Sequence, residues 1–289
     1  MKFGLFAALA APYVTTEGLV TLTQEAEARG YESLWVAEHV VLFDEYAPDY
    51  PYDENGRFPA TADSGILEPL STLAFLAAQT STIRLGTGIL LLPQRNPVYT
   101  AKEVANIDWL SGGRFDLGIG VGWCQEEFAA VDVSWPKRGK RTDEYIAVMR
   151  SLWTEDVSSF SGEFYELDKA RMYPKPLQER LPIHVGGESD AAMRRAARHG
   201  DGWYTFNRLP ADVTAAMPRL EELLAEAGRS RDGFQLSVCP YLQGIDPDMV
   251  TAYGEAGVDR VIGMVFGATG DDFKAALDDL QPCLDASRA

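Results

Sequence analysis

The chain has 289 residues with 43 acidic and 26 basic side chains, and its formal net charge of −17 argues against nucleic acid or an anionic membrane as a partner. Hydrophobic residues make up 46% of the sequence, enough for one large core, and no apolar run approaches the roughly 18 residues of a membrane-spanning helix. The cysteines, Cys124, Cys239 and Cys283, are odd in number and far apart, so no disulfide framework is predicted and a cytoplasmic location is expected.

Short apolar runs alternate with longer segments of helical periodicity. The runs are short enough for buried strands and cover residues 2–9, 33–37, 83–92, 114–122, 182–187, 202–206, 234–242 and 260–266. In the other segments apolar residues recur every three or four positions, which predicts helices over residues 16–29, 68–80, 97–110, 140–153, 189–199, 210–227, 247–256 and 271–284. Eight such units without a visible linker predict an α/β fold, a (β/α)8 TIM barrel, with residues 1–289 as a single domain. A doubly wound open sheet, the alternative, would leave units to place in a second domain.

Two long insertions interrupt the alternation, one after strand 2 at residues 41–65 and one before strand 5 at residues 156–181. The first is rich in tyrosine, proline and acidic residues and follows a predicted strand. Because loops after the strands of such a barrel lie on the face that carries the active site, this insertion is expected to cover a site there. A variable surface loop without a role is the alternative.

Alternate glycines end the fourth predicted strand, at Gly118, Gly120 and Gly122. The next helix does not begin where a dinucleotide-binding turn requires it, so that motif is not predicted. The glycines instead keep one face of the strand flat for a planar ligand, or allow tight packing inside the barrel, and this stretch alone supports both interpretations equally.

A second pair, Gly186 and Gly187, leads into a predicted helix with Ser189 as its N-cap. Main-chain amides at such a turn can bind a phosphate. Glu188 would disfavour an anion unless its side chain points away, and a purely structural turn is the commoner use of two glycines.

An acid and a histidine, Glu38 and His39, follow the second predicted strand in the stretch "SLWVAEHV". An imidazole at the rim of a barrel can accept or donate a proton near neutral pH and can be oriented by a carboxylate. A histidine that only caps the strand is the alternative. His184 is expected to be an interior histidine rather than a ligand neighbour, and His199 to be structural at a helix end. No spacing of histidines or cysteines is typical of a metal site, so none is predicted.

Several longer stretches carry a family resemblance: "GLFAAL", "YESLWVAEHV", "IRLGTGILLLPQRNPVYTAKEVANIDWLSGGRFDLGIGVGW", "RGKRTDEYIAVMRSLWT" and "IHVGGESDAAMRRAARHGDGWY". They resemble the bacterial luciferase-like monooxygenase superfamily, and within it the probable F420-dependent oxidoreductases. The resemblance spans nearly the whole chain and is specific through residue 205. It implies a (β/α)8 barrel that holds a flavin or deazaflavin ring at the carboxyl ends of its strands.

The resemblance also implies site residues. Glu38 and His39 match the acid and histidine beside the reactive ring carbon, and Gly88-Ile89 matches a non-prolyl cis peptide behind the ring. The remaining matched positions border the ring, bind the cofactor phosphate or line a substrate pocket; they are Gly120, Val121 and Gly122 for the ring, Gly186, Gly187, Glu188 and Ser189 for the phosphate, and Trp123 with Tyr46 for the substrate.

One position departs from the family pattern. Trp123 stands at or near the place of a glutamate that serves several of these enzymes as a proton donor, while Glu126 and Glu127 lie a turn further on. The acid role is therefore not transferred, which leaves His39, Glu38 or a substrate group as the proton partner. Two basic residues, Arg138 and Arg141, are candidates to reach an anionic part of the cofactor or substrate.

The resemblance implies an oxidoreductase that transfers a hydride between the deazaflavin coenzyme F420 and an unidentified small organic substrate. An FMN-dependent monooxygenase that uses O2 is the alternative, and a catalytically silent barrel that binds flavin or a partner protein is an alternative of another class. A homodimer is a further possibility.

Overall fold

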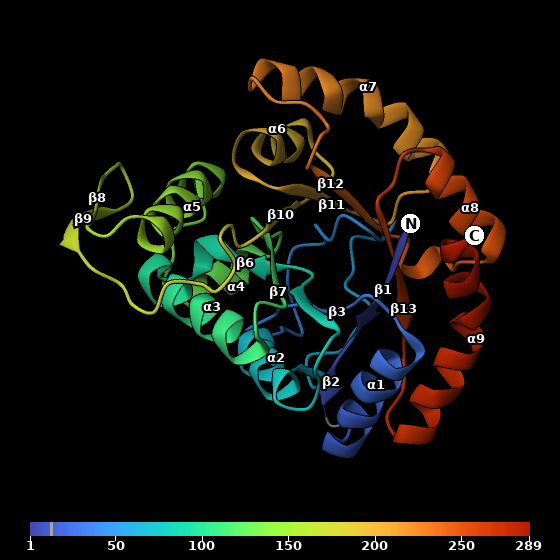
Figure 1. Cartoon of the computed structure of the whole chain (residues 1–289). Coiled ribbons are helices and arrows are strands. Elements are labelled where there is room, and N and C mark those ends of the chain that lie inside the picture. The colour runs from blue at the N-terminus through green and yellow to red at the C-terminus, as the bar shows by residue number, and fades with distance from the viewer. Residues whose placement is uncertain (12–13) are drawn as a thin grey trace.

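A computed structural model describes residues 1–11 and 14–289 (Figure 1). Within these residues, eight parallel strands form a closed barrel: β1 (Lys2–Ala7), β3 (Ser33–Val36), β5 (Arg84–Thr87), β7 (Phe115–Gly120), β10 (Ile183–Gly186), β11 (Gly202–Phe206), β12 (Gln235–Cys239) and β13 (Arg260–Val265). Each strand pairs with the next, the pairing of β7 with β10 continues the ring, and β13 closes it on β1. The predicted (β/α)8 TIM barrel is confirmed, and the open sheet is excluded.

The helices surround the barrel as an outer ring: α1 (Thr16–Arg29), α2 (Pro69–Ala77), α3 (Pro97–Ser111), α4 (Gln125–Ala130), α5 (Arg138–Thr154), α6 (Asp190–His199), α7 (Pro210–Glu226), α8 (Pro247–Glu255) and α9 (Gly270–Arg288). Every predicted helix is present, and only the short α4 was not predicted. Ser189 caps α6 as expected, since its hydroxyl accepts a hydrogen bond from the Ala192 N–H at 3.2 Å. In the described part of the chain, no helix has the length and apolar character needed to cross a membrane.

The strands bury side chains on both faces, which is why they appear in the sequence as continuous apolar runs. Outward-facing residues such as Leu34 and Val36 join the main core beneath the helices. Inward-facing Trp35 packs in a separate cluster with Phe6, Tyr204, Cys239 and Ile262 in the middle of the barrel. Side chains therefore alternate along β3, with Trp35 and Val36 on opposite faces.

The third predicted strand is divided into two pieces. β5 ends at Thr87, and the short strand β6 (Leu90–Leu91) continues beside β7 before the 3-10 turn η1 (Leu92–Gln94). The Gly88-Ile89 peptide between the two pieces is cis, as predicted.

The two insertions have different places. Residues 41–65 lie over the carboxyl ends of the strands, and their last residues form β4 (Gly65–Ile66), which pairs with β2 (Ala10–Ala11). Residues 156–181 include the antiparallel hairpin of β8 (Ser158–Ser161) and β9 (Glu166–Ala170), which lies outside the barrel beside α5 (Figure 1). Glu144 of α5 accepts hydrogen bonds from the main chain of this hairpin, at 3.0 Å from Glu163 and 2.8 Å from Phe164.

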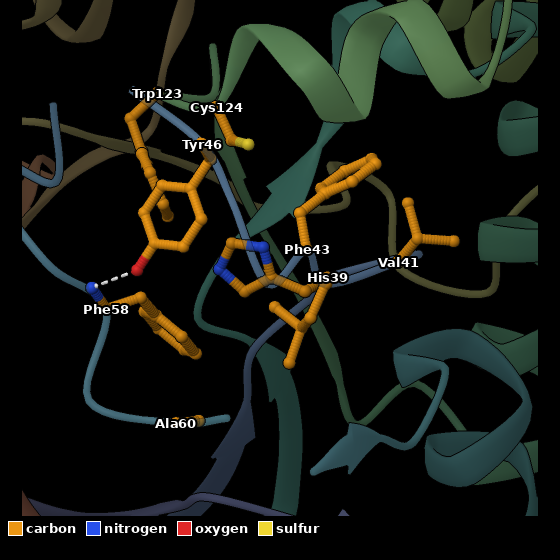
Figure 2. Close-up of a pocket in the computed structure, with 9 residues that line it drawn as sticks. His39, Val41, Phe43, Tyr46, Phe58, Ala60, Trp123 and Cys124 are labelled. Carbon is orange, nitrogen blue, oxygen red and sulfur yellow. Dashed lines mark hydrogen bonds between the residues drawn. The ribbon is translucent and has the colours of Figure 1, made fainter. Parts of the chain in front are cut away.

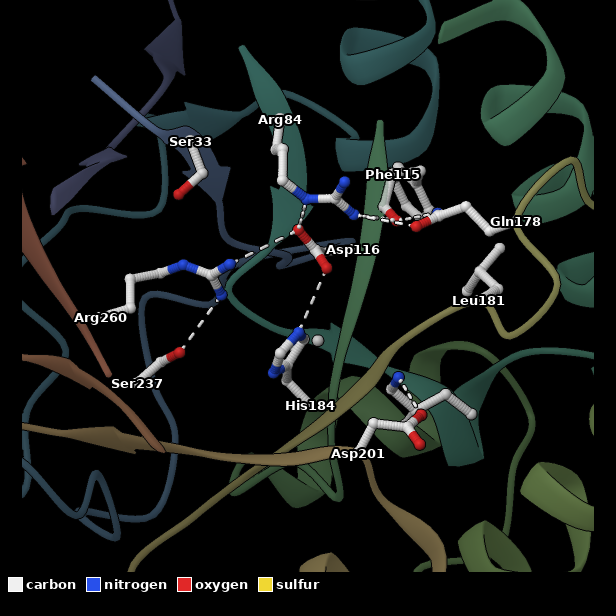
Figure 3. A network of polar contacts seen from close by, with 12 residues as sticks. Ser33, Arg84, Phe115, Asp116, Gln178, Leu181, His184, Asp201, Ser237 and Arg260 are labelled. Carbon is white, nitrogen blue, oxygen red and sulfur yellow. Dashed lines mark hydrogen bonds and ion pairs between the residues drawn. The ribbon is translucent and has the colours of Figure 1, made fainter. Parts of the chain in front are cut away.

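His184 lies inside the barrel near its amino-terminal end, in a network of charged side chains (Figure 3). Its Nε2 atom is 3.3 Å from Asp116 Oδ1, and its ring meets the Trp35 ring edge-on with centroids 5.5 Å apart. It is an interior histidine, as expected.

Candidate active site

A cavity of about 1420 Å³ opens at the carboxyl ends of the strands. Nearly all predicted site residues line it: Glu38, His39, Gly88, Ile89, Gly120, Val121, Gly122, Trp123, Gly186, Gly187, Glu188 and Ser189. Tyr46 instead lines a small adjoining pocket that shares His39, Phe58 and Trp123 with the cavity (Figure 2). The cavity is lined by residues at the carboxyl ends of all eight barrel strands and by residues of the insertion at 41–65, whereas no residue of 156–181 is among the lining residues.

Glycines form the floor of the cavity, around the Ile89 side chain. A Cβ atom on Gly120 would lie 1.8 Å from Ile89 Cδ1, and one on Gly186 would lie 2.9 Å from Ile89 Cγ2. Gly118 is one step deeper, and a Cβ atom there would lie 1.9 Å from the Thr87 main-chain oxygen. Gly118 and Gly120 therefore both permit close packing, Gly118 against the Thr87 main chain and Gly120 against the Ile89 side chain. The interpretation that these glycines keep a face flat for a planar ligand stays a prediction.

His39 has its ring between aromatic side chains. The centroid of its ring is 4.6 Å from that of Phe58 and 5.8 Å from that of Trp123. In Figure 2 one ring nitrogen faces these aromatic residues and Tyr46. The other, Nδ1, is 3.4 Å from the Oε2 atom of buried Glu127. His39 is thus held by its surroundings while it lines the cavity.

Glu38, next to His39, is bound by an arginine that sequence analysis missed. Arg95 donates hydrogen bonds from Nε, at 2.8 Å, and from Nη2 to Glu38 Oε1, and the Leu91 N–H donates to Oε2. Burial raises the pKa of Glu38 above that of a free carboxyl group, and the charge of Arg95 opposes this effect. Both carboxylate oxygens are therefore engaged away from the cavity.

The turn at Gly187 has the features of an anion site. Gly187 has φ of +117°, a conformation that favours glycine, and α6 begins directly after Ser189. Glu188 turns toward β11, where it accepts hydrogen bonds from the Thr205 hydroxyl at 2.7 Å and the Phe206 N–H at 2.8 Å, and forms an ion pair with Arg208. The carboxylate that would repel an anion is therefore satisfied elsewhere.

The two predicted arginines differ in position. Arg138 lines the cavity: its guanidinium lies 3.6 Å from the Trp135 ring centroid, and its Nε donates to the Gly122 carbonyl at 3.3 Å. Among the described residues no carboxylate lies within ion-pair distance of it. Burial, and then the charge of Arg195, lowers the pKa of Arg138. Arg141 is buried and donates to the Ser134 carbonyl at 2.7 Å without lining the cavity, so the expectation that it reaches a ligand is wrong.

Aromatic residues also line the cavity. The Tyr50 and Tyr241 hydroxyls are 3.1 Å apart, which connects the insertion to the turn after β12. Phe206 packs against Tyr241 in a tilted arrangement with ring centroids 4.4 Å apart, and it meets Tyr52 of the insertion edge-on with centroids 4.9 Å apart. Phe206 and Tyr241 were not predicted from the sequence. The signal for them is that Phe206 is the last residue, and Tyr241 the second last, of a predicted strand.

Solved structures share this fold. An F420-dependent secondary alcohol dehydrogenase in complex with an F420-acetone adduct has a TM-score of 0.76 at 19% identity, covering 100% of this chain and 99% of that chain. The 3,6-diketocamphane monooxygenase of Pseudomonas putida in complex with FMN has a TM-score of 0.64 at 19% identity, covering 82% of this chain and 66% of that chain.

Sequence relatives are closer. An uncharacterised protein of Mycobacterium tuberculosis is 36% identical over 243 residues, 84% of this chain and 83% of its own length. The F420-dependent glucose-6-phosphate dehydrogenase of Kineococcus radiotolerans is 31% identical over 218 residues, 73% of this chain and 59% of its own length. Residues 1–245 match the luciferase-like monooxygenase family. As the sequence resemblance predicted, the chain belongs to the luciferase-like monooxygenase family.

Proposed function

We propose that the protein is an oxidoreductase that transfers a hydride between coenzyme F420 and a small organic substrate. The observation that carries this proposal is the position of His39, which lines the cavity next to a glycine floor with a buried carboxylate behind it. The relative named as F420-dependent, at 31% identity, supports F420 as the cofactor.

The cavity fits such a cofactor. Gly120 lets the Ile89 side chain lie close to β7 in the cavity lining, where the planar ring is proposed to rest on it, and the turn at Gly187 offers main-chain amides to a phosphate. Arg138 adds a cation without a carboxylate partner among the described residues, which suits the anionic tail that F420 carries and FMN lacks.

Bound F420 would supply a ring carbon that accepts or donates the hydride. His39 is the residue we propose for the accompanying proton. When an alcohol is oxidised, its hydroxyl proton passes to the imidazole as the hydride leaves the carbon, and in the reverse direction the imidazolium returns it. Glu38 accepts hydrogen bonds from Arg95 and so fixes the chain at the end of β3. Residues 41–65, several of which line the cavity, are proposed to exclude water from it.

An uncharged, largely apolar substrate suits the wall of the cavity. Trp123 and Tyr46 meet at a centroid distance of 5.6 Å near His39, and Phe206 and Phe266 line the opposite side. Two of the acidic groups that line the cavity, Glu38 and Glu188, are neutralised by arginines. Arg138, which has no carboxylate partner among the described residues, is proposed to bind the cofactor and not the substrate.

The deciding experiment is a fluorescence titration of the protein with F420 and with FMN, each oxidised and reduced, at fixed salt. We expect F420 to bind at least tenfold more tightly. Arg138→Ala should weaken F420 binding about tenfold, the scale of one charge-assisted hydrogen bond, and affect FMN less. Lys140→Ala, which removes an exposed cation of α5 paired with Glu163, is the matched control.

A redox assay with F420 and uncharged alcohols such as 2-propanol, cyclohexanol and benzyl alcohol then tests the reaction. Tighter binding of FMN with consumption of O2 would support the monooxygenase alternative. Binding without any redox activity would support the catalytically silent barrel.

A further inference from the structure

Glu127 is a carboxylate buried behind the proposed active site. It lies in the first turn of α4, and its side chain is 1% exposed. Burying an ionised carboxylate costs several kcal/mol unless charges or hydrogen bonds compensate it. Glu127 accepts hydrogen bonds from the Val40 N–H at 2.7 Å and from Gln94 Nε2 at 3.3 Å.

The basic group next to Glu127 is a histidine and not an arginine or a lysine. Buried Glu38, the other acid near His39, is paired with an arginine. Within the described residues no arginine or lysine lies within ion-pair distance of Glu127, and the group that can carry a positive charge there is the His39 imidazole, with Nδ1 3.4 Å from Oε2. A charge on His39 is therefore the one that Glu127 is placed to stabilise.

The Glu127 carboxylate also contacts the main chain next to His39 and thereby fixes the position of the His39 side chain. Its Oε1 atom holds the main chain at Val40, one residue after His39, while Oε2 faces the ring. Glu127 approaches the Nδ1 side, which leaves Nε2 directed toward Phe58 and Tyr46 (Figure 2). Glu127 does not itself line the cavity. It can thus act on a bound substrate only through His39.

We propose that Glu127 is a positioning residue that orients His39 and stabilises the imidazolium formed when His39 takes a proton from the substrate. No bond to Glu127 forms or breaks: the proton moves between the substrate oxygen and His39, and Glu127 takes no part in that transfer. This inference rests on the proposed function for its catalytic part, whereas the interaction of the two side chains can be tested without cofactor or substrate.

Glu126 provides a matched control in the neighbouring position. Its Oε1 atom accepts a hydrogen bond from the Ala47 N–H at 2.9 Å, and its Oε2 atom lies 3.5 Å from Cys124 Sγ. It is the same residue type on the same helix and, like Glu127, accepts a hydrogen bond from a main-chain N–H, but it has no hydrogen bond or ion pair with His39. A Glu126→Gln variant therefore removes a nearby acid without touching the proposed pair.

The first test is an NMR titration of the histidine rings in cofactor-free protein, which is tractable because the chain has 3 histidines. Glu127→Gln keeps the shape and an acceptor for Val40 but removes the charge. We expect the His39 ring to lose its proton at lower pH in Glu127→Gln than in the parent, with no change in Glu126→Gln. Identical titrations in all three proteins would overturn the pairing, whatever the reaction of the enzyme is.

The second test uses turnover with F420 and the best alcohol of the panel. Glu127→Gln should lower kcat about 10- to 100-fold with little change in KM, and move the acid limb of the pH profile. Glu127→Asp keeps the charge, so its kcat should lie between those of Glu127→Gln and the parent. It replaces Glu127→Gln in this test if the glutamine variant does not fold. In a His39→Ala background, Glu127→Gln should have little further effect. The proposal would be overturned if the effects of Glu127→Gln and His39→Ala on kcat were fully additive, or if kcat of Glu127→Gln stayed within threefold of the parent.

Discussion

The three histidines of this chain lie in different environments. His39 faces aromatic residues and a buried carboxylate at the rim of the cavity, and His184 meets Asp116 inside the barrel. His199 ends α6, where burial lowers its pKa. Of the three, His39 is the one that lines the cavity, which is why the proposed proton transfer is assigned to it.

A residue-scale prediction concerns Gly187 in the proposed phosphate turn. Its φ of +117° strains any side chain, and a Cβ atom there would lie 3.0 Å from Ala192 Cβ, so Gly187→Ala is needed as the control for backbone effects. We expect Gly187→Asp to bind F420 at least tenfold more weakly than Gly187→Ala, because a carboxylate repels the phosphate. Fluorescence titration measures both, with circular dichroism as the check on folding. Equal affinities of the two variants would remove this turn from the cofactor site.

At the scale of elements, β7 carries two glycines with separate roles. In Gly118→Ala the new methyl group would meet the Thr87 main chain, which cannot move aside, so the free energy of unfolding should fall by about 2 kcal/mol or more. In Gly120→Ala it would instead displace the Ile89 side chain into the cavity. We expect that variant to remain closer to the parent in urea denaturation but to bind F420 about tenfold more weakly. Unchanged affinity in Gly120→Ala would show that this face of β7 does not support the ring.

The barrel was predictable because each strand is a short apolar run between amphipathic helices, a pattern that depends on neighbouring residues alone. The elements that were missed lack this signal. α4 spans Gln125–Ala130, too short to show helical periodicity, and β9 (Glu166–Ala170) is a polar edge strand outside the core. The break within residues 83–92 was expected only from the family resemblance.

The candidate site was predictable where residues lie at strand ends, and less so where they meet across the sequence. Arg95 is 57 positions from Glu38, and Glu127 is 87 positions from Val40. Neither contact leaves a local pattern, because the barrel alone brings these segments together. The role of Glu127 became visible only when its neighbours were known.

At the scale of the whole molecule, a charged network ties the amino-terminal end of the barrel together, opposite the cavity (Figure 3). Asp116 of β7 accepts a hydrogen bond from Arg84 Nε at 2.6 Å and lies 3.9 Å from Arg260 Nη2. Arg260 of β13, 1% exposed, also donates to Glu32 at 2.8 Å and to the Ser237 hydroxyl at 3.3 Å. With His184 of β10, the network joins strands from both halves of the chain. It lies next to Trp35, whose ring is 5.1 Å from the Arg260 guanidinium carbon.

The stability of the barrel should therefore depend on the charge of Asp116. Burial alone would raise the pKa of this carboxyl group, but the hydrogen bonds to His184 and Arg84 and the charge of Arg260 outweigh it and lower the pKa. A carboxyl group with a lowered pKa in the folded state stabilises the protein above its unfolded pKa, near 3.9, and loses that contribution as the pH falls toward the folded value. Asp116→Asn leaves buried Arg260 and half-buried Arg84 with one acid fewer, so it should cost about 3 kcal/mol at pH 7.

Urea denaturation of the parent and Asp116→Asn at pH 7 and at about pH 3 measures this difference directly. We expect the gap between the two proteins to be largest at pH 7 and to narrow at acid pH, because the parent carboxylate begins to take up a proton there on unfolding. Asp156→Asn, which removes an exposed partner of Arg171 on the outer hairpin, should leave the unfolding free energy unchanged at both pH values. A gap that is the same at both pH values would mean that Asp116 contributes through shape and hydrogen bonding and not through its charge.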